Sequence, residues 1–136
     1  MFPATTKILV VDDMPTIRDL VKSQLRALNL KNVVEAGDGA AALALIENAA
    51  SVGHPIELVI SDWNMPKMTG LELLRQLRAS DEFANLPFIL LTSESERDQV
   101  TEAILAGVSQ YIVKPFAAKS FEDKVKAVWA KIQKAS

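Results

Sequence analysis

Short apolar runs alternate with longer amphipathic stretches along the chain. The runs occupy residues 7–11, 32–36, 57–61, 87–92 and 110–113, and they are rich in residues that favour β-structure. Most of them are continuous in hydrophobicity, which is typical of strands that are covered on both faces. We therefore predict five short strands at these positions.

The stretches between the runs have the periodicity of amphipathic helices. In the first stretch Pro15 suits the first turn. Apolar residues then recur there at helical spacing, namely Ile17, Leu20, Val21, Leu25 and Leu28. The last stretch repeats the pattern with Phe121, Val125, Val128 and Ile132. Three more helices are predicted near residues 39–50, 69–79 and 95–106, the last of them closed by Gly107.

This order of elements predicts the fold class. Five strand–helix units in succession favour an α/β domain with a parallel sheet, right-handed crossovers and helices on both faces. We find no internal repeat and no interdomain linker in the sequence. A chain of 136 residues fits one domain. We predict a single domain over residues 1–136, with a core over about residues 7–134.

Composition narrows the function classes. Apolar residues make up 49% and charged residues 24% of the chain, as in ordinary soluble proteins. The absence of cysteine excludes disulfides, thiolate metal sites and a cysteine nucleophile. The formal charge of −2 argues against general nucleic-acid binding. No apolar run approaches the roughly 18 residues of a membrane span, and residues 1–7 lack a signal-peptide pattern, so we expect a cytoplasmic protein.

The last part of the chain has an excess of positive charge. Between Lys114 and Ser136, six lysines stand against Glu122 and Asp123. Lysines in the last turn of a helix complement the carbonyl end of the helix dipole. Lysines on one surface can also bind an acidic partner. The sequence alone leaves both interpretations open.

Residues whose side chains can bind ligands or take part in a reaction stand where the predicted strands end. Asp12 and Asp13 follow the first strand, Asp62 the third and Lys114 the fifth, while Thr92 ends the fourth. In open parallel sheets, ligands bind outside the carboxyl ends of the strands. We therefore expect three carboxylates, a hydroxyl and an ammonium group to converge on one edge of the sheet.

This set of groups suits phosphoryl transfer assisted by a divalent cation. Neighbouring carboxylates repel each other unless a cation joins them, and Mg²⁺ prefers a few carboxylates together with water and phosphate oxygens. Asp62 can act as a nucleophile toward a phosphoryl group. Lys114 can neutralise phosphoryl oxygens, and Thr92 can donate a hydrogen bond to one of them. We predict a Mg²⁺-dependent phosphorylation site at Asp62.

Longer motifs around these residues resemble those of a known family. They are residues 12–13 (DD), 62–66 (DWNMP), 70 (G), 92–94 (TSE) and 111–116 (YIVKPF). In order and spacing they are similar to the receiver domains of two-component response regulators, and within that family to the chemotaxis regulators. The resemblance extends from Lys7 to the last helix. It implies a flavodoxin-like fold with strand order 2-1-3-4-5.

The resemblance implies an acceptor and a metal site. Asp62 would accept the phosphoryl group. Asp13, Asp62 and the backbone carbonyl of Asn64 would bind Mg²⁺, and Asp12 would act through a metal-bound water. We expect Trp63 to be a partly exposed neighbour of this site.

The resemblance also implies a switch. Lys114 would pair with the acceptor and then with the phosphoryl group, and the peptide bond that follows Lys114 would be cis. Thr92 and Tyr111 would form the switch pair, although a tyrosine on this strand can also be a simple core residue. Asn64 and Glu94 would tune dephosphorylation.

By the same resemblance, the output is the binding of another protein. A histidine kinase would supply the phosphoryl group, a phosphatase could assist its removal, and the protein would act as a monomer. The partner implied by the chemotaxis regulators is a flagellar motor switch protein. The predicted binding surface lies on the fourth helix, fifth strand and fifth helix, and it includes Arg97, Tyr111, Val113, Lys119, Lys124 and Lys126.

Two features depart from the family pattern. Thr69 stands where the family usually has Asp before Gly70, but Thr can still cap a helix. The loop before the third strand, near residues 51–55, is longer than usual. We expect little effect from it, because it lies at the opposite end of its helix from the site.

Three other functions fit parts of the pattern. A hydrolase with an aspartyl-phosphate intermediate needs a second acid two residues after the nucleophile, where this chain has Asn64. A flavin carrier needs a hydroxyl-rich phosphate loop, whereas residues 12–15 (DDMP) would repel a phosphate. A phosphorelay intermediate would use the same acceptor and pass the phosphoryl group to a histidine phosphotransfer domain. We expect a signalling switch with weak intrinsic phosphotransfer and dephosphorylation rather than an enzyme.

Overall fold

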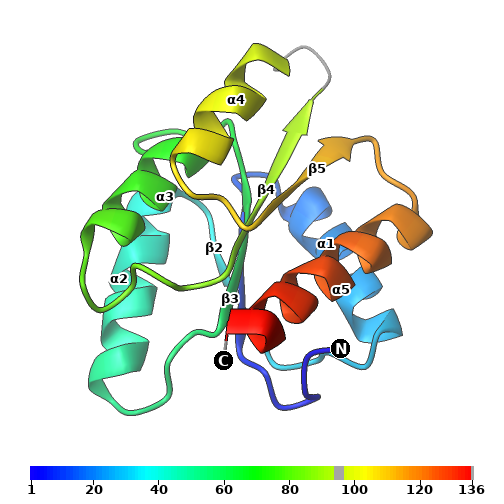
Figure 1. The fold of residues 1–136 in the computed structure, drawn as a ribbon, viewed down its shortest axis with the longest axis horizontal. Coiled ribbons are helices and arrows are strands. Elements are labelled where there is room, and N and C mark those ends of the chain that lie inside the picture. Colours follow the sequence, from blue (N-terminus) through cyan, green and yellow to red (C-terminus); the bar gives the residue numbers. More distant parts are fainter. Residues whose placement is uncertain (94–96, 136) are drawn as a thin grey trace.

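The computed structural model describes residues 1–93 and 97–135, in which five strands alternate with five helices (Figure 1). In chain order these elements are β1 (Ile8–Val11), α1 (Pro15–Ala27), β2 (Val33–Ala36), α2 (Gly39–Ser51), β3 (Leu58–Asp62), α3 (Gly70–Ala79), β4 (Phe88–Ser93), α4 (Arg97–Leu105), β5 (Gln110–Lys114) and α5 (Ala118–Ala135). Each predicted strand is present, and its ends are shifted by about one residue at most.

All five strands lie parallel in one sheet, in the order β2-β1-β3-β4-β5. This confirms the predicted fold class and strand order. Figure 1 shows α1 and α5 on one side of the sheet, and α2, α3 and α4 on the other. The register places Val11 beside Ser61 and Ser93 beside Lys114. The carboxyl ends of the strands therefore meet at one edge of the sheet.

The side chains of each strand alternate between two apolar layers. Leu9 and Val11 of β1 pack in the layer under α2 and α3, whereas Ile8 and Val10 pack in the layer under α1 and α5. All four side chains are at most 1% exposed. Burial on both faces explains why the strand is hydrophobic at every position, as the pattern predicted.

Side-chain caps fix the starts of two helices beside the carboxyl edge. Thr69 precedes α3, and its hydroxyl oxygen accepts a hydrogen bond from the N–H of Glu72 at 3.1 Å. Oε1 of Glu72 accepts from the N–H of Thr69 at 2.9 Å, which completes a capping box. Asp38 caps α2 by accepting from the N–H of Ala41 at 2.8 Å. Thr69 thus caps its helix, as expected of this departure from the family pattern.

The fourth helix ends as the sequence predicts. Gly107 follows it with a φ of 93°, and the N–H of Val108 donates to the carbonyl of Ala103 at 3.1 Å. The predicted helix began at residue 95, and residues 95–96 lie outside the described residues. Within the described ranges, no helix is both long and apolar enough to cross a membrane.

The N-terminal residues pack against the last helix, which the sequence pattern did not predict. Phe2 is 5% exposed and belongs to the apolar layer under α1 and α5. Its ring centroid lies 5.0 Å from that of Trp129 on α5. This apolar layer therefore begins before the first strand.

Candidate functional site

Three carboxylates meet at the carboxyl edge of the sheet. Asp12 follows β1, where its N–H donates to the carbonyl of Ala36 at 3.1 Å, and Asp62 is the last residue of β3. One carboxylate oxygen from each of Asp12, Asp13 and Asp62 lies within 4.8 Å of the others. Asp12 and Asp62 are buried, whereas Asp13 is exposed to solvent. The structure thus brings together the three acids that the strand ends predicted.

Burial disfavours the charged form of the Asp12 carboxyl group. Removal of this group from water raises the pKa of Asp12 to about 6. A hydrogen bond from the N–H of Met14 at 2.9 Å lowers the pKa of Asp12, and the negative charge of Asp62 raises it further. The second oxygen of Asp12, Oδ2, is buried and has no hydrogen-bond partner among the residues that the structure describes. A buried oxygen of this kind, beside two other carboxylates, suits a divalent cation or a water bound to one.

Lys114 offsets part of this negative charge. It ends β5, and its Nζ forms an ion pair with Oδ1 of Asp62. The two residues meet because only β4 separates β3 from β5 in the sheet. The peptide bond between Lys114 and Pro115 is cis, as the resemblance implies. Among the described residues, Lys114 is the one cation paired with a carboxylate of this cluster, so the cluster keeps an excess of negative charge that favours a bound cation.

Thr92 and Tyr111 lie on the same face of the sheet. Leu90 pairs with Tyr111 and Thr92 pairs with Val113 across β4 and β5, and residues two apart on a strand share a face. Thr92 is buried, and its hydroxyl donates to the carbonyl of Ser93 at 3.4 Å. Tyr111 packs partly buried against the apolar layer under α2 and α3. The predicted switch residues are therefore neighbours on adjacent strands.

Gly70 sets the distance between α3 and the backbone of Asp62. A Cβ atom at this position would lie 2.2 Å from the carbonyl oxygen of Asp62 and 2.8 Å from a methyl carbon of Leu90. The N–H of Gly70 donates to the carbonyl of Trp63 at 2.9 Å. In the sequence, Gly70 is only part of a motif. The structure explains why glycine stands there, because a larger residue would displace the end of β3 that holds Asp62.

The expectation that Trp63 is partly exposed is wrong. Its side chain is 4% exposed and belongs to the apolar layer under α2 and α3. The N–H of Trp63 still donates to the carbonyl of Leu91 at 3.1 Å, so the chain follows the sheet one residue beyond β3 and the indole packs in the core. Asn64, the next residue, is exposed in the loop before α3.

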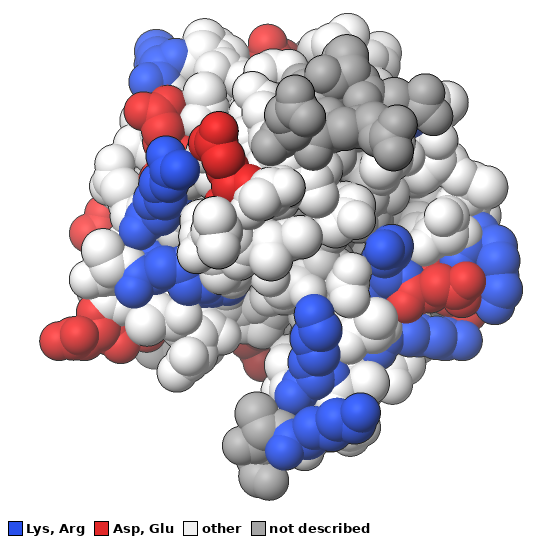
Figure 2. All heavy atoms as spheres, turned by 45° about the horizontal axis from the view of Figure 1, so that its top comes forward, with Lys and Arg blue, Asp and Glu red and all other residues white. Residues whose placement is uncertain are grey.

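The predicted partner surface is less basic than the count of lysines suggests. On α5 the ammonium of Lys119 lies 3.0 Å from a carboxylate oxygen of Asp123, and that of Lys126 lies 2.8 Å from one of Glu122. Figure 2 shows acidic side chains between basic ones on the right of the face that it presents. These pairs are four residues apart and partly neutralise the charge of the helix.

Other members of the predicted surface differ in exposure. Val113 is 38% exposed. Lys124 is partly buried, and its ammonium lies 5.1 Å from the ring centroid of Tyr111 and 3.5 Å from Oε1 of Gln110. The side chain of Arg97 lies outside the described residues. The same holds for Glu94, the second residue expected to tune dephosphorylation.

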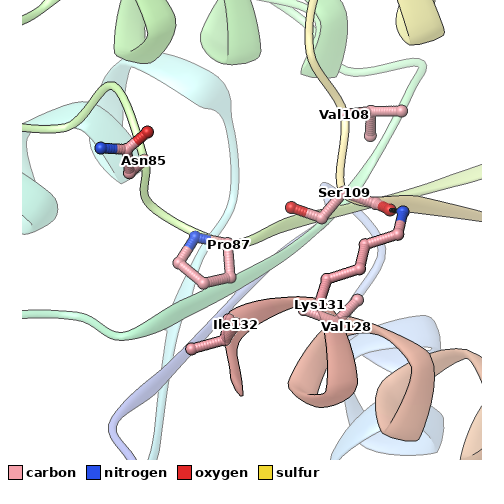
Figure 3. A pocket seen from close by; sticks show the side chains of 7 residues that line it. All are labelled: Asn85, Pro87, Val108, Ser109, Val128, Lys131 and Ile132. Atoms are coloured by element: carbon pink, nitrogen blue, oxygen red, sulfur yellow. Dashed lines mark hydrogen bonds between the residues drawn. The ribbon is translucent and has the colours of Figure 1, made fainter. Parts of the chain in front are cut away.

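A hollow of about 480 Å³ lies at the opposite, amino edge of the sheet (Figure 3). Its lining residues come from the segments before β4 and β5 and from α5, and they are Asn85, Pro87, Val108, Ser109, Val128, Lys131 and Ile132. The Nζ of Lys131 donates to the carbonyl of Ser109 at 2.6 Å. None of these lining residues has a carboxylate side chain. The hollow therefore differs in chemistry from the acidic cluster at the carboxyl edge.

Comparison with known proteins defines the class. The family model of the response regulator receiver domain matches residues 8–126, which contain all five strands. The chain belongs to the response regulator receiver family. A receiver domain is a phosphorylation switch rather than an enzyme of the usual kind, and the Asp12, Asp13 and Asp62 cluster is typical of its metal site.

Relatives of this chain include bacterial chemotaxis proteins. The chain is 40% identical to the chemotaxis protein CheY of Pseudomonas aeruginosa over 93% of its own length and 98% of the relative. It is 41% identical to CheY-3 of Vibrio cholerae, over 93% of each chain. The solved structure of CheY4 from Vibrio cholerae superimposes with a TM-score of 0.78 at 31% identity, over 91% of this chain and 98% of that one. The receiver domain is therefore CheY-like.

Proposed function

We propose that Asp62 is the phosphoacceptor of a Mg²⁺-dependent switch, and that residues 1–136 act as one receiver module. The main support is the convergence of Asp12, Asp13 and Asp62 with the ammonium group of Lys114 at one edge of the sheet. Asp62 is the acid that ends a strand and pairs with this lysine. Its carboxylate is therefore held where the charge of an incoming phosphoryl group can be neutralised.

The donor groups at this edge fit Mg²⁺. Asp13 and Asp62 offer carboxylate oxygens, Asn64 offers its backbone carbonyl, and the unpartnered Oδ2 of Asp12 suits a metal-bound water. Bound Mg²⁺ would neutralise charge on the acids and on the phosphoryl oxygens. The excess of carboxylates over ammonium groups supports this assignment.

The proposed phosphoryl donor is the phosphohistidine of a histidine kinase. An oxygen of Asp62 forms the new P–O bond while the P–N bond to the donor breaks, and the leaving imidazole keeps the electron pair. The ammonium of Lys114 then contacts a phosphoryl oxygen. Water later attacks phosphorus, which restores the carboxylate and releases inorganic phosphate, and Asn64 and Glu94 tune this step. A phosphatase can accelerate it.

Thr92 and Tyr111 are proposed to transmit the change to the surface formed by α4, β5 and α5. A charge-assisted hydrogen bond from the Thr92 hydroxyl to a phosphoryl oxygen would replace its 3.4 Å bond to the Ser93 carbonyl. This movement leaves space for Tyr111 to turn further inward. The surface that includes Val113 and Lys124 then favours a second conformation, which a partner can select.

The proposed output is the binding of a flagellar motor switch protein by a cytoplasmic monomer. Support comes from the identity of about 40% with chemotaxis proteins named CheY. Together with Tyr111, Val113 and Lys124, the contact surface would include Arg97, Lys119 and Lys126. In a phosphorelay, a histidine phosphotransfer domain would be the recipient instead. Capture experiments with phosphorylated protein distinguish the two partners.

Labelling by acetyl phosphate with Mg²⁺ tests the acceptor. The unaltered protein should gain one phosphoryl group, and Asp62→Asn should abolish labelling because an amide is no nucleophile toward phosphorus. Asp81→Asn is the matched control, since Asp81 is an exposed acid in the loop after α3. It should be labelled like the unaltered protein. Equal labelling of the Asp62 variant would refute the assignment.

A further inference from the structure

Arg18 joins three elements around the acidic cluster. From α1, its Nη1 donates to the backbone carbonyl of Asp12 at 2.5 Å, and its Nε donates to Oε1 of Glu35 on β2 at 3.0 Å. The Arg18 side chain is 19% exposed. The carbonyl that it contacts belongs to the peptide that links Asp12 to Asp13. The guanidinium therefore restrains the orientation of the peptide from which two carboxylates of the cluster project.

Glu35 holds this guanidinium in place. One of its oxygens accepts from Arg18, and the other accepts from Nζ of Lys22 at 3.0 Å. The hydrogen bond from Lys22 is the main cause that lowers the pKa of Glu35, burial opposes it, and the bond from Arg18 adds to it. Glu35 is therefore ionised near neutral pH and binds both cations through separate oxygens.

The contact between Arg18 and the cluster is made through the backbone. Among the described residues, no hydrogen bond or ion pair joins Arg18 to a carboxylate of Asp12, Asp13 or Asp62. Its direct contact therefore acts on the orientation of the peptide that joins two of the three acids. A residue that orients the ligands of a metal without touching the metal typically contributes about 10- to 100-fold to metal affinity.

We propose that Arg18 is a positioning residue of the acidic cluster, held in place by Glu35, and that it prepares Asp12 and Asp13 for Mg²⁺. This inference rests on the Mg²⁺ binding proposed above. Lys22 shares the partner of Arg18, but within residues 1–93 and 97–135 it makes no hydrogen bond to Asp12. The two cations thus form a matched pair, of which one reaches the backbone of the site.

Calorimetric titration with Mg²⁺ at constant ionic strength tests the proposal. Arg18→Ala should weaken Mg²⁺ binding by about 10- to 100-fold. Lys22→Ala removes a bond to the other oxygen of the same Glu35 carboxylate and should change the affinity by about twofold at most. Arg18→Lys should fall between them, because one ammonium group cannot reproduce the two-directional bonding of a guanidinium. Thermal unfolding without Mg²⁺ checks that the variants are folded.

Each outcome has a separate meaning. Equal Mg²⁺ affinities for Arg18→Ala and Lys22→Ala would overturn the positioning role while leaving the proposed function intact. Absence of Mg²⁺ binding by the unaltered protein would overturn the proposed function itself, and this inference with it. If Arg18→Ala does not fold, Arg18→Lys and Glu35→Gln decide the matter, since both should weaken Mg²⁺ binding by about threefold or more. Unchanged affinity in both variants would refute the proposal.

Discussion

The two edges of the sheet are built from the same five strands, yet their polar groups differ in how well they are satisfied. At the carboxyl edge, Asp12 has a raised pKa and a buried oxygen that accepts no hydrogen bond from the described part of the chain. At the amino edge, Lys131 points to a hollow but donates to the carbonyl of Ser109 (Figure 3). Of these two polar groups, the unsatisfied one is thus at the edge where a ligand is expected, which is a common mark of functional sites.

The largest effect should come from removing an acid at the carboxyl edge. Asp13→Ala should weaken Mg²⁺ binding by about 100-fold, because it removes a proposed direct carboxylate ligand. Lys114→Ala should leave Mg²⁺ binding largely intact but uncouple phosphorylation from partner binding. Calorimetric titration of both variants measures the difference. Equal losses of Mg²⁺ affinity would contradict this division of roles.

The next effect concerns pH and the Asp12 carboxyl group. Its pKa is about 6 in the folded protein against 3.8 as a reference, so the folded state binds the proton more tightly. The contribution of Asp12 to stability therefore falls as pH rises from about 4 to above 6, by about 2–3 kcal/mol in total. We expect the free energy of unfolding of Asp12→Asn, relative to that of the unaltered protein, to rise by this amount between pH 4 and pH 7. Chemical unfolding without Mg²⁺ measures this difference. A constant difference would contradict the raised pKa.

A smaller effect is expected at the proposed switch. Thr92→Ala should still be phosphorylated, because the proposed acceptor is Asp62. The gain in partner affinity on phosphorylation should shrink from about tenfold to about twofold. Lys124→Glu is the companion variant. It should weaken partner binding in both states while sparing phosphorylation. Fluorescence anisotropy with a labelled partner segment measures both, and a full gain in Thr92→Ala would place the switch elsewhere.

The smallest effect is expected at the amino edge. Lys131→Ala removes one hydrogen bond to a backbone carbonyl and should lower the free energy of unfolding by about 0.5–1.5 kcal/mol. Phosphorylation and Mg²⁺ binding should not change. Denaturant unfolding and acetyl phosphate labelling measure the two quantities. Slower phosphorylation of this variant would show that the two edges are coupled.

The sequence predicted the parts of this molecule that depend on burial and topology. Strands with both faces covered are hydrophobic throughout, as β1 is, so the pattern located them closely. Parallel topology then placed Asp12, Asp62 and Lys114 at one edge, because strand ends are simple to identify in sequence. These inferences need no knowledge of side-chain packing.

Details that depend on packing were not predictable. Trp63 was expected to be partly exposed, because periodicity does not show that the chain follows the sheet beyond a strand. The contact of Phe2 with Trp129 joins the two ends of the sequence and has no local signal. The ion pair between Lys119 and Asp123 was visible as a four-residue spacing, yet a count of net charge conceals it. The contact between Arg18 and the Asp12 carbonyl could be identified only from the folded structure.

The ion pair between Lys114 and Asp62 also has a consequence for folding. It joins residues 52 positions apart in the chain, so it closes a large loop and cannot form until β3, β4 and β5 are all in place. A nascent chain that lacks β5 has the acids but not the lysine that neutralises them. The proposed coupling of phosphorylation to partner binding therefore requires the completely folded chain, and an incompletely folded chain that lacks β5 would not signal.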